Sequence, residues 1–509
     1  MTGPGGARAA GLQSGAVFKK LRELAVNLTV YGIGDVAVQL ASFLLLPVYT
    51  IVLSPTEYGA IALLLIVEQV VRVLNRWGID AAFMRFYFDC ADTAARRLLA
   101  STIFFFLAGA GGLLAAAGLA AAPHLARPLF GGGDFTAAFR VVMITTLFGA
   151  VSFLPFHVLR IEGRARTFVA LTFANNLATL VAKLLLVVGL RKGVMGVVLA
   201  DLLVAVGLAL ALLPRYAALI RPVFSLRVLA ECLKFGLPRV PHSFAHQIIA
   251  VADRVTLSRF APLQQLGVYN VGASLGLGLK LFLSAFETAW APFYFKEMHA
   301  PNAKRTYRTM TTYAFGALAL LVAGLAAVSR DLVRLMTVPR FHGAGDIVPW
   351  IGLGVGLQGI YLLTSIGLNI TKRTVYYPVA TGLAAAAALG ASLVLVPRYG
   401  AIGAAWSNVA AYGVLAAAGM ALSQRFYPIA YEWSRLWRLA AAALLAVAAA
   451  RLAAGPAIAP VAGVLLRGAC AVAVFGATLA ASGFFEPEEL AVIRRAAGRA
   501  AGAVRARVP

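Results

Sequence analysis

Residues 167–214 read TFVALTFANNLATLVAKLLLVVGLRKGVMGVVLADLLVAVGLALALLP. Two apolar runs, 167–190 and 193–214, flank one short basic turn. Each run is about 20 residues long, the length that a helix needs to cross the hydrocarbon core of a bilayer. Only helices and closed barrels satisfy their backbone groups in lipid, and apolar runs that do not alternate with polar residues favour helices. The stretch therefore predicts two membrane-spanning helices.

The rest of the chain has the composition of a membrane protein. Of 509 residues, 61% are hydrophobic and 13% charged, and the mean hydropathy is +0.84. A soluble protein carries roughly 25% charged residues. The first 18 residues contain no apolar stretch of signal-peptide length, so we expect the run 24–53 to be a retained span. Three cysteines (Cys90, Cys232, Cys470) lack metal or disulfide spacing and are expected to be buried thiols.

Apolar runs of this kind predict an all-α polytopic membrane protein with about fourteen spans. We expect them at 24–53, 57–79, 98–122, 138–158, 167–190, 193–214, 236–260, 265–290, 309–328, 346–368, 376–396, 400–422, 436–453 and 460–482. The last run contains one charged residue, Arg467. The predicted parts are a cytoplasmic tail (1–23), an N-lobe (24–228), a C-lobe (229–424), two further spans (425–484) and a second cytoplasmic tail (485–509).

Basic residues lie mainly in alternate connections between the predicted spans. With the N-terminus in the cytoplasm, they outnumber the basic residues of the outer loops about three to one. This bias predicts that both termini are cytoplasmic. It also accounts for the net charge of +25 without a nucleic-acid partner, because the charge is spread over short connections and does not form one soluble face.

The chain repeats itself at an offset of 207 residues. Three pairs of segments match in order: 85–88 with 292–295, 166–167 with 373–374, and Gly193-Val-Met-Gly196 with Gly400-Ala-Ile-Gly403. Gly59 corresponds to Gly267 with a shift of one residue. A repeat of six spans enters the membrane twice from the same side, so the halves should be parallel and related by an axis along the membrane normal. The last two spans lie outside the repeat.

Several charged residues fall where lipid is expected. Arg72 lies near the middle of the second span, which we expect to run from Tyr58 to about Arg85, and Lys280 lies near the middle of the eighth. Each such charge costs roughly 2.5–3.5 kcal/mol on insertion scales, so it usually faces a cavity or a partner. Glu68, Arg72 and Arg76 share one helix face. Asp80 and Glu287 occupy matched positions nearer the cytoplasm.

Cations at mid-depth in both halves predict a cavity between the two halves, basic at its centre, for an anionic group such as a phosphate or pyrophosphate. Arginine grips such oxygens with two parallel hydrogen bonds, and lysine adds a point charge. The alternative for Glu68 and Arg72 is a neutralised intrahelical pair. This alternative explains Arg76 and Lys280 less well, because no acid lies one turn from Lys280.

Other polar residues are open to two readings. Asp253, next to Arg254, either pairs with a helix neighbour or takes part in ion coupling, while Asp35, Lys183 and Asp201 are equally well explained as contacts between helices or as substrate ligands. His242 and His246 share a helix face but lack a third ligand, so we expect no metal.

Four stretches resemble one known family. They are LLLPVYTIVLSPTEYGAIALL (44–64), LKFGLPRVPHSFAHQIIAVADRVTLSRFAPLQQLGVYNVG (233–272), LVPRYGAIGAAWSNVAAY (395–412) and FYPIAYEWSRL (426–436). They resemble the Wzx-type polysaccharide flippases of the multidrug/oligosaccharidyl-lipid/polysaccharide exporter superfamily. The likeness covers most of the chain, through loose motifs.

This resemblance implies two six-helix lobes that alternate between inward-open and outward-open states. The implied substrate is an undecaprenyl-pyrophosphate-linked repeat unit of O-antigen, capsule or exopolysaccharide, moved to the outer leaflet of the bacterial inner membrane. Arg72, Arg76, Lys280 and Arg254 would receive the pyrophosphate, and Glu68, Asp253 or Glu287 would bind a coupling proton or Na⁺. No other cofactor is implied. Glycan polymerase or export machinery would be the protein partners.

Two rival functions remain. A cation-coupled multidrug exporter of the same superfamily would be expected to have an acidic cavity, which Arg72, Arg76 and Lys280 oppose. A membrane enzyme of glycan assembly would need larger loops than those near 123–137 and 329–345. The sequence has no paired-carboxylate or nucleotide-binding pattern, so we expect no enzyme.

Overall fold

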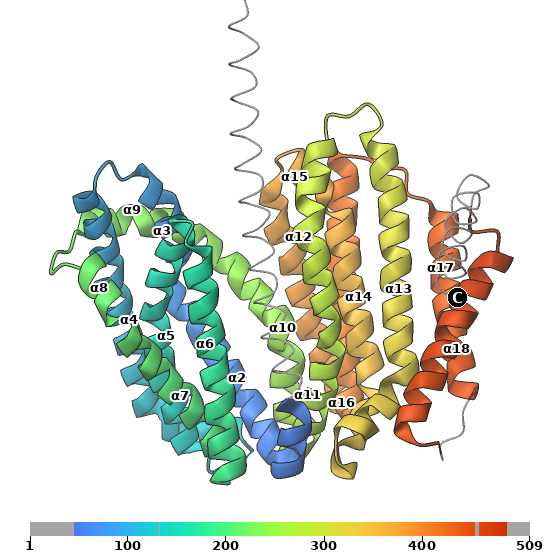
Figure 1. Cartoon of the computed structure of the whole chain (residues 1–509), viewed down its shortest axis with the longest axis horizontal. Coiled ribbons are helices and arrows are strands. Elements are labelled where there is room, and N and C mark those ends of the chain that lie inside the picture. The colour runs from blue at the N-terminus through green and yellow to red at the C-terminus, as the bar shows by residue number, and fades with distance from the viewer. Residues whose placement is uncertain (1–44, 132, 454–457, 486–509) are drawn as a thin grey trace, which may run out of the picture. The chain divides into compact units, whose positions relative to one another are not determined.

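The structure is a computed structural model that describes residues 45–131, 133–453 and 458–485 (Figure 1). Every regular element in these residues is helical. Among them, nine helices are long and apolar enough to cross a membrane. The predicted all-α polytopic fold is therefore confirmed, but the number of fourteen spans is not. Most of the first predicted span, 24–53, lies outside the described residues.

The chain divides into two compact units. The first unit comprises the described residues up to Ser274 together with Ala385–Ser407. Its helices are α2 (Pro55–Arg76), α3 (Ile79–Asp89), α4 (Thr93–Leu129), α5 (Thr136–Ile161), α6 (Ala165–Lys183), α7 (Gly193–Ala211), α8 (Leu213–Leu219), α9 (Leu226–Gly236), α10 (Val240–Phe260) and α11 (Leu263–Gly276). A π-helical turn, η1 (Leu184–Gly189), continues α6.

The second unit comprises Leu275–Ala384 and the described residues from Asn408 onward. Its helices are α12 (Lys280–Glu297), α13 (Ala303–Met336), α14 (Val348–Thr364), α15 (Ile366–Ile370), α17 (Trp433–Leu452) and α18 (Pro460–Ala481). Helix α16 (Tyr377–Phe426) contributes to both units. The predicted boundary between lobes at 228/229 stays a prediction.

Two glycines at equivalent repeat positions turn the backbone between successive helices. Gly193 has φ +54° at the start of α7, and Gly400 has φ +55° inside α16. Backbone of this kind is left-handed and favours glycine. Because Gly400 is non-helical, α16 consists of two helices joined at a kink, in agreement with the two spans predicted at 376–396 and 400–422.

The start of α2 is fixed by local hydrogen bonds. Ser54 accepts a bond from the amide of Glu57 (3.2 Å), and the Glu57 carboxylate accepts from the amide of Ser54 (2.8 Å). Pro55 occupies the first turn, where its missing N–H costs nothing. This capping box ends the preceding segment and sets the register of the helix that carries Glu68, Arg72 and Arg76.

The prediction that the second span runs unbroken to about Arg85 was wrong. Trp77 and Gly78 have φ of +50° and +70°, and they separate α2 from α3. A side chain at Gly78 would overlap the carbonyl of Gly236 at the end of α9. The break therefore allows a close backbone approach that apolar periodicity does not encode.

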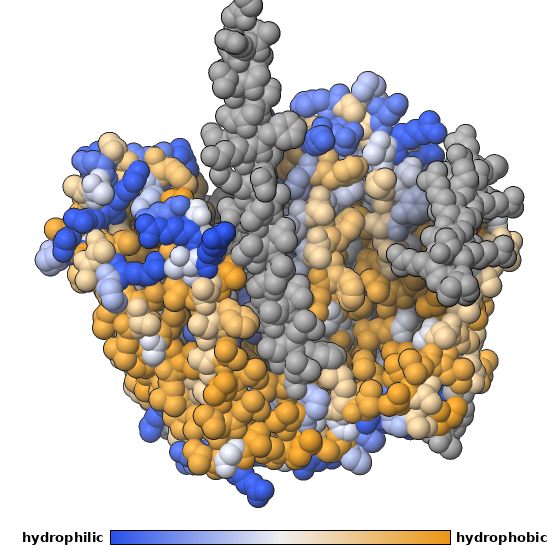
Figure 2. Space-filling view, in the orientation of Figure 1, coloured by the Kyte–Doolittle hydropathy of each residue, from blue (hydrophilic) through white to orange (hydrophobic). Residues whose placement is uncertain are grey.

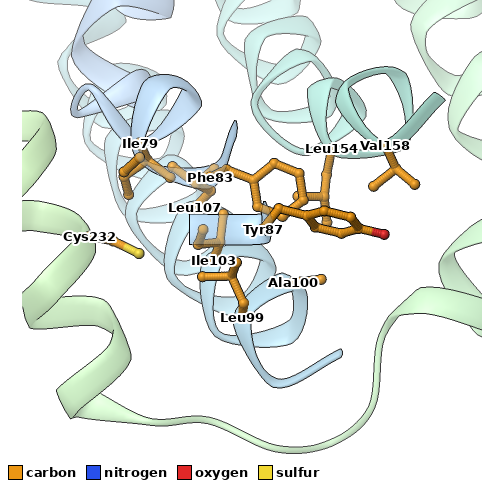
Figure 3. Packing of buried hydrophobic residues seen from close by; sticks show 11 residues of the cluster. Ile79, Phe83, Tyr87, Leu99, Ala100, Ile103, Leu107, Leu154, Val158 and Cys232 are labelled. Carbon is orange, nitrogen blue, oxygen red and sulfur yellow. The ribbon is translucent and has the colours of Figure 1, made fainter. Parts of the chain in front are cut away.

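A hydrophobic cluster joins α3, α4, α5 and α9 (Figure 3). Its buried members include Phe83 and Tyr87 of α3, Ile103 of α4, Leu154 of α5 and Cys232 of α9. Burial of side chains of this size contributes roughly 1.5–3 kcal/mol each. The cluster holds the short α3 and α9 against the long helices of the first unit.

Several charges of the second unit form ion pairs. Arg467 of α18 forms a buried ion pair with Asp331 of α13, which explains an arginine within a predicted span. Glu432 lies between Arg308 (2.9 Å) and Arg435 (3.2 Å). These pairs fasten the last two helices to α13.

The outer surface suits lipid. On the face shown in Figure 2, hydrophobic residues cover the middle of the helices in each unit, and hydrophilic residues gather near the helix ends. Leu185, Leu203 and Leu210, on η1 and α7, are each about 60% exposed. Leucines exposed over whole helices are expected where the surroundings are hydrocarbon.

Candidate functional site

A cavity of about 300 Å³ lies inside the first unit, among helices α2 to α7. Helix α2 lines it with one face, on which Glu68, Arg72 and Asn75 follow at helical spacing and Arg76 completes the row. Since all six helices belong to one unit, the cavity lies within a single compact body.

Helices α6 and α7 form the opposite part of the lining. Asn175, Thr179 and Lys183 are each four residues apart, so they share one face of α6. On α7, Asp201 is followed by apolar residues at helical spacing: Val204, Ala205 and Leu208. The cavity is therefore polar along α2 and α6 and partly apolar along α7.

Three ion pairs occupy the cavity lining. Glu68 and Arg72 pair within α2. Lys183 Nζ lies 2.9 Å from Asp201 Oδ1 and joins α6 to α7. The third pair is looser, because 3.9 Å separates the Arg76 guanidinium from the carboxylate of Asp80 in α3.

The charged groups are balanced and close to one another. Three cations and three carboxylates line the cavity. Asp201 lies within electrostatic range of Glu68 and Arg72 as well as of Lys183. A carboxylate beside each cation orients the cation, and it can be displaced by another anion that offers the same oxygen geometry. Arg76, whose side chain is 56% exposed, has the weakest partner of the three.

Neutral polar groups form the rest of the lining. They come from three helices: Asn75 of α2, Thr145, Thr146 and Ser152 of α5, and Asn175 and Thr179 of α6. The Thr145 hydroxyl donates to the carbonyl of Val141 and the Thr179 hydroxyl to that of Asn175, both at 2.9 Å. Both hydroxyl hydrogens take part in hydrogen bonds within their own helices, so the oxygens offer mainly acceptor lone pairs to the cavity.

The remaining predicted site residues lie elsewhere. Asp253 of α10 is buried and accepts hydrogen bonds from Tyr269 Oη (2.5 Å) and from its neighbour's amide. Arg254 donates to the carbonyl of Ala250 (2.9 Å) and lies 5.9 Å from the ring centre of Tyr269. Neither Asp253 nor Arg254 belongs to the described lining of the cavity.

Lys280 and Glu287 belong to the second unit. Lys280 begins α12, and its ammonium lies 6.0 Å from the ring centre of Tyr412. Glu287, also on α12, is exposed. The structure thus groups Glu68, Arg72 and Arg76 with one another and leaves the roles of Lys280 and Glu287 as predictions.

Sequence reasoning had not assigned the neutral side chains of the cavity. The signal was present in α6, where Asn175, Thr179 and Lys183 recur every four residues within an apolar run. Asn75 gave a weaker signal, between two arginines of α2. Among the described residues, no group of three His, Cys, Asp or Glu side chains is arranged to hold a metal ion.

Comparisons with known proteins place the chain in a wider context. Residues 50–346 match the family model described as "Polysaccharide biosynthesis protein". No curated protein sequence matches the chain. The solved structure of the lipid II flippase MurJ, in an inward closed conformation, has a TM-score of 0.69 at 14% identity, and the match covers 89% of this chain and 99% of MurJ.

Two structures of multidrug resistance MATE family transporters of the MOP superfamily also match. The inward-facing one has a TM-score of 0.65 at 16% identity and covers 80% of this chain and 98% of its own. The outward-facing one has a TM-score of 0.55 at 16% identity, with 81% and 96% covered. At these identities the likeness establishes the fold.

Proposed function

Because the chain belongs to the polysaccharide biosynthesis protein family, we propose that it flips a lipid-linked oligosaccharide across the bacterial cytoplasmic membrane. The proposed substrate is an undecaprenyl-pyrophosphate-linked repeat unit of O-antigen, capsule or exopolysaccharide, moved from the cytoplasmic to the outer leaflet. Both termini are proposed to be cytoplasmic. A glycan polymerase or export complex would receive the product.

The family and the fold also decide whether the protein is a transporter or an enzyme. Membership confirms the resemblance to polysaccharide flippases predicted from the sequence. The family and the fold are those of membrane transporters and not of enzymes, so the glycan-assembly enzyme is excluded. The chain is a multi-pass membrane protein whose fold serves both flippases and multidrug exporters.

The observation that carries the proposal is the group of cations within one cavity of the first unit. Arg72, Arg76 and Lys183 line the same space. A diphosphate that left water without such partners would pay a large desolvation cost. Guanidinium groups offset this cost because they stay charged and their paired N–H donors match phosphate oxygens.

The proposed mechanism is alternating access. The diphosphate enters from the cytoplasmic side and displaces the carboxylates of Glu68 and Asp80 from their arginines, while the polyprenyl tail stays in lipid. Movement of the two lobes then exposes the headgroup to the outside. Lys280 is proposed to supply a further cation from the second repeat, and Arg254 a weaker one.

Ion coupling is proposed to act through an acid. A carboxylate that loses its cation in a poorly hydrated site is costly unless it binds a proton or Na⁺. Glu68, Asp253 and Glu287 remain the candidates. Glu68 is the one among them that lines the described cavity.

A multidrug exporter is the second candidate. The cavity lining carries as many carboxylates as cations, so its charge does not exclude a cationic substrate. Cells lacking the protein would be probed for lipid-linked glycan with a reagent that reaches only the outer leaflet. The variants are Arg72→Gln with Arg76→Gln, and separately Lys280→Met. Arg85→Gln is the matched control, since Arg85 forms an i,i+4 pair with Asp89 at 2.7 Å outside the cavity lining.

We expect outer-leaflet glycan to be lost without the protein and restored by wild type and by Arg85→Gln. The double arginine variant should lose at least tenfold, because a hydrogen bond to a charged group is worth about 1.5–3 kcal/mol. Normal outer-leaflet glycan in the deletion strain would reject the flippase. Accumulation of a cationic dye in the same strain would then favour drug export.

A further inference from the structure

The ion pair between Lys183 and Asp201 is the part of the cavity lining that the proposed mechanism does not use. Lys183 Nζ lies 2.9 Å from Asp201 Oδ1, and the two side chains are 16% and 24% exposed. Both residues line the cavity. In the other two ion pairs of the lining, the cation is more than half exposed. The pair of Lys183 and Asp201 is therefore the most buried of the three, and it still borders the space that the diphosphate would enter.

Asp201 has mainly apolar surroundings on its other side. A small second space, bordered by α2, α5 and α7, lies beside it. The charged residues of this lining are Asp201 and Glu68, Thr145 adds a hydroxyl, and the other six residues are aliphatic. Two carboxylates beside one apolar space repel each other, so both stay ionised only while each has its cation.

Four titratable or charged side chains of the described residues act electrostatically on Asp201. They are Lys183 of α6, Glu68 and Arg72 of α2, and Tyr49 in the described segment before α2. Lys183 forms the ion pair with Asp201, whereas Arg72 is paired with Glu68. Without Lys183, Asp201 would thus keep a neutral phenol, a second carboxylate and an arginine that another acid already engages. A carboxylate in such a position is costly unless it binds a proton.

Lys183 lies at an irregularity of its helix. It is the last residue of α6, and the π-helical turn η1 begins at Leu184. Turns of this kind are rare and occur frequently at functional sites. An ammonium group is a point charge with three rotatable donors, so Lys183 can turn from one anion to another without keeping a fixed geometry. The side chain is thus suited to exchange its carboxylate for a phosphate oxygen.

Charge balance identifies the acid that must respond to the substrate. Three cations and three carboxylates line the cavity, so a diphosphate adds negative charge that the lining does not compensate. Asp80 is 37% exposed, and water can solvate it once Arg76 turns away. Glu68 stays one turn from Arg72 on the same helix. Asp201 has neither advantage, because its cation belongs to another helix.

We propose that Asp201 takes up one proton when Lys183 leaves it for the diphosphate, so that substrate binding is coupled to protonation of the cavity. A proton from the aqueous phase forms an O–H bond with the Asp201 carboxylate, and the Lys183 ammonium exchanges this carboxylate for a phosphate oxygen. No electron is transferred, and release of the substrate reverses both changes. The inference rests on the proposed function and names an acid outside the set of Glu68, Asp253 and Glu287.

The number of protons taken up can be measured on the purified full chain in lipid nanodiscs. The probe is farnesyl diphosphate that carries one N-acetylhexosamine on its terminal phosphate. Each phosphate of this probe keeps one ionised oxygen near neutral pH, so the probe itself exchanges no proton. Calorimetric titrations in two buffers of different ionisation enthalpy then give the protons bound per probe from the difference in heat.

The variants are Asp201→Asn, Asp201→Glu and Glu68→Gln. Asp89→Asn is the matched control, because Asp89 pairs with Arg85 outside the described cavity lining. Wild type, Asp201→Glu, Glu68→Gln and Asp89→Asn should each take up about one proton per bound probe, and Asp201→Asn should take up none.

The affinity for the probe should depend on pH in the same way. The wild-type complex holds one proton more than the free protein wherever Asp201 is ionised in the free protein and protonated in the complex. In that range the wild-type affinity should fall about tenfold for each unit rise in pH. The affinity of Asp201→Asn should stay constant over the same range.

A double variant keeps the test independent of folding. Asp201→Asn leaves Lys183 without its partner, so Lys183→Met with Asp201→Asn is measured as well, because it removes both charges of the pair. The double variant should bind the probe more weakly than wild type and take up no proton.

Binding by wild type without proton uptake would overturn the inference and leave the flippase in place. Uptake that persists in Asp201→Asn or in the double variant, or that is lost in Glu68→Gln alone, would assign the proton to another group and also reject the inference. The proposed function fails separately, if the probe does not bind wild type or binds equally well to Arg72→Gln with Arg76→Gln.

Discussion

Gly59 of α2 and Gly267 of α11 contact each other reciprocally. A Cβ at Gly59 would overlap the carbonyl oxygen of Leu263, four residues before Gly267, and a Cβ at Gly267 would overlap that of Pro55, four residues before Gly59. Each Cβ would also lie 3.1 Å from the other glycine's amide nitrogen. Equivalent positions of the two repeats thus meet as in a contact between symmetric copies.

A second pair of contacts follows the same symmetry. A Cβ at Gly193 would lie 2.6 Å from Glu57 Oε1, and one at Gly400 would lie 2.8 Å from Gln265 Oε1. Glu57 and Gln265 correspond at the offset that relates Gly59 to Gly267. The repeat therefore extends from sequence matches to packing.

Gly267→Ala should lower the thermal unfolding temperature of the protein in detergent. A methyl group cannot fit against the Pro55 carbonyl, so α2 and α11 must separate, which costs roughly 1–3 kcal/mol. Gly207→Ala on α7 is the control, since no atom within 4 Å meets its Cβ. Equal unfolding temperatures for the two variants would contradict the close contact.

Glu68→Gln should tighten the binding of farnesyl diphosphate. The carboxylate competes with phosphate for Arg72 and repels it, and its removal should raise affinity on the order of tenfold. Asp89→Asn removes the partner of Arg85, whose ion pair lies outside the cavity lining, and should have no effect. Weaker binding by Glu68→Gln would mean that Glu68 positions Arg72 for the anion.

Lys183→Met and Asp201→Asn should each lower the free energy of unfolding more than the double variant does. The pair is about four-fifths buried, and removing one partner leaves a charge in poor solvent, at a cost on the order of 2 kcal/mol. Unfolding of wild type, both single variants and the double variant gives the coupling free energy. Additive effects would show that the 2.9 Å pair contributes no coupling.

Cys90 tests the predicted orientation, because it lies between α3 and α4 on the predicted cytoplasmic side. A membrane-impermeant maleimide should label it in inverted vesicles and not in intact cells. Burial raises the pKa of the Cys90 thiol, so labelling should speed up roughly tenfold per pH unit up to that pKa, as thiolate forms.

Cys232 is the internal control for that experiment. It is 1% exposed, and burial raises the pKa of its thiol to about 11. It should stay unlabelled near neutral pH in both preparations. Labelling of Cys90 from outside intact cells would reverse the predicted topology.

Local rules predicted much of the fold and part of the site. Apolar runs placed the helices, and the glycines at 193 and 400 marked turns that the structure confirms. The pair of Glu68 with Arg72 follows from i,i+4 spacing alone. The two interpretations of Glu68 and Arg72 are compatible, because the residues form an intrahelical ion pair and also line the cavity.

Contacts between distant helices were beyond local rules. Lys183 and Asp201 lie on separate helices, and the sequence left two roles equally open for each, a contact between helices or a substrate ligand. Arg467 forms an ion pair with Asp331, which lies 136 residues earlier in the sequence. The break at Gly78 depends on the approach of Gly236, which no periodic pattern records.

The ion pair between Asp331 and Arg467 bears on how the chain could be shortened. Asp331 is 2% exposed on its side chain, and its partner comes from the last described helix. A protein truncated before α17 would leave the buried Asp331 carboxylate without its partner Arg467, which costs about 3–5 kcal/mol. A shortened chain that lacks the last two helices therefore needs a compensating substitution at residue 331.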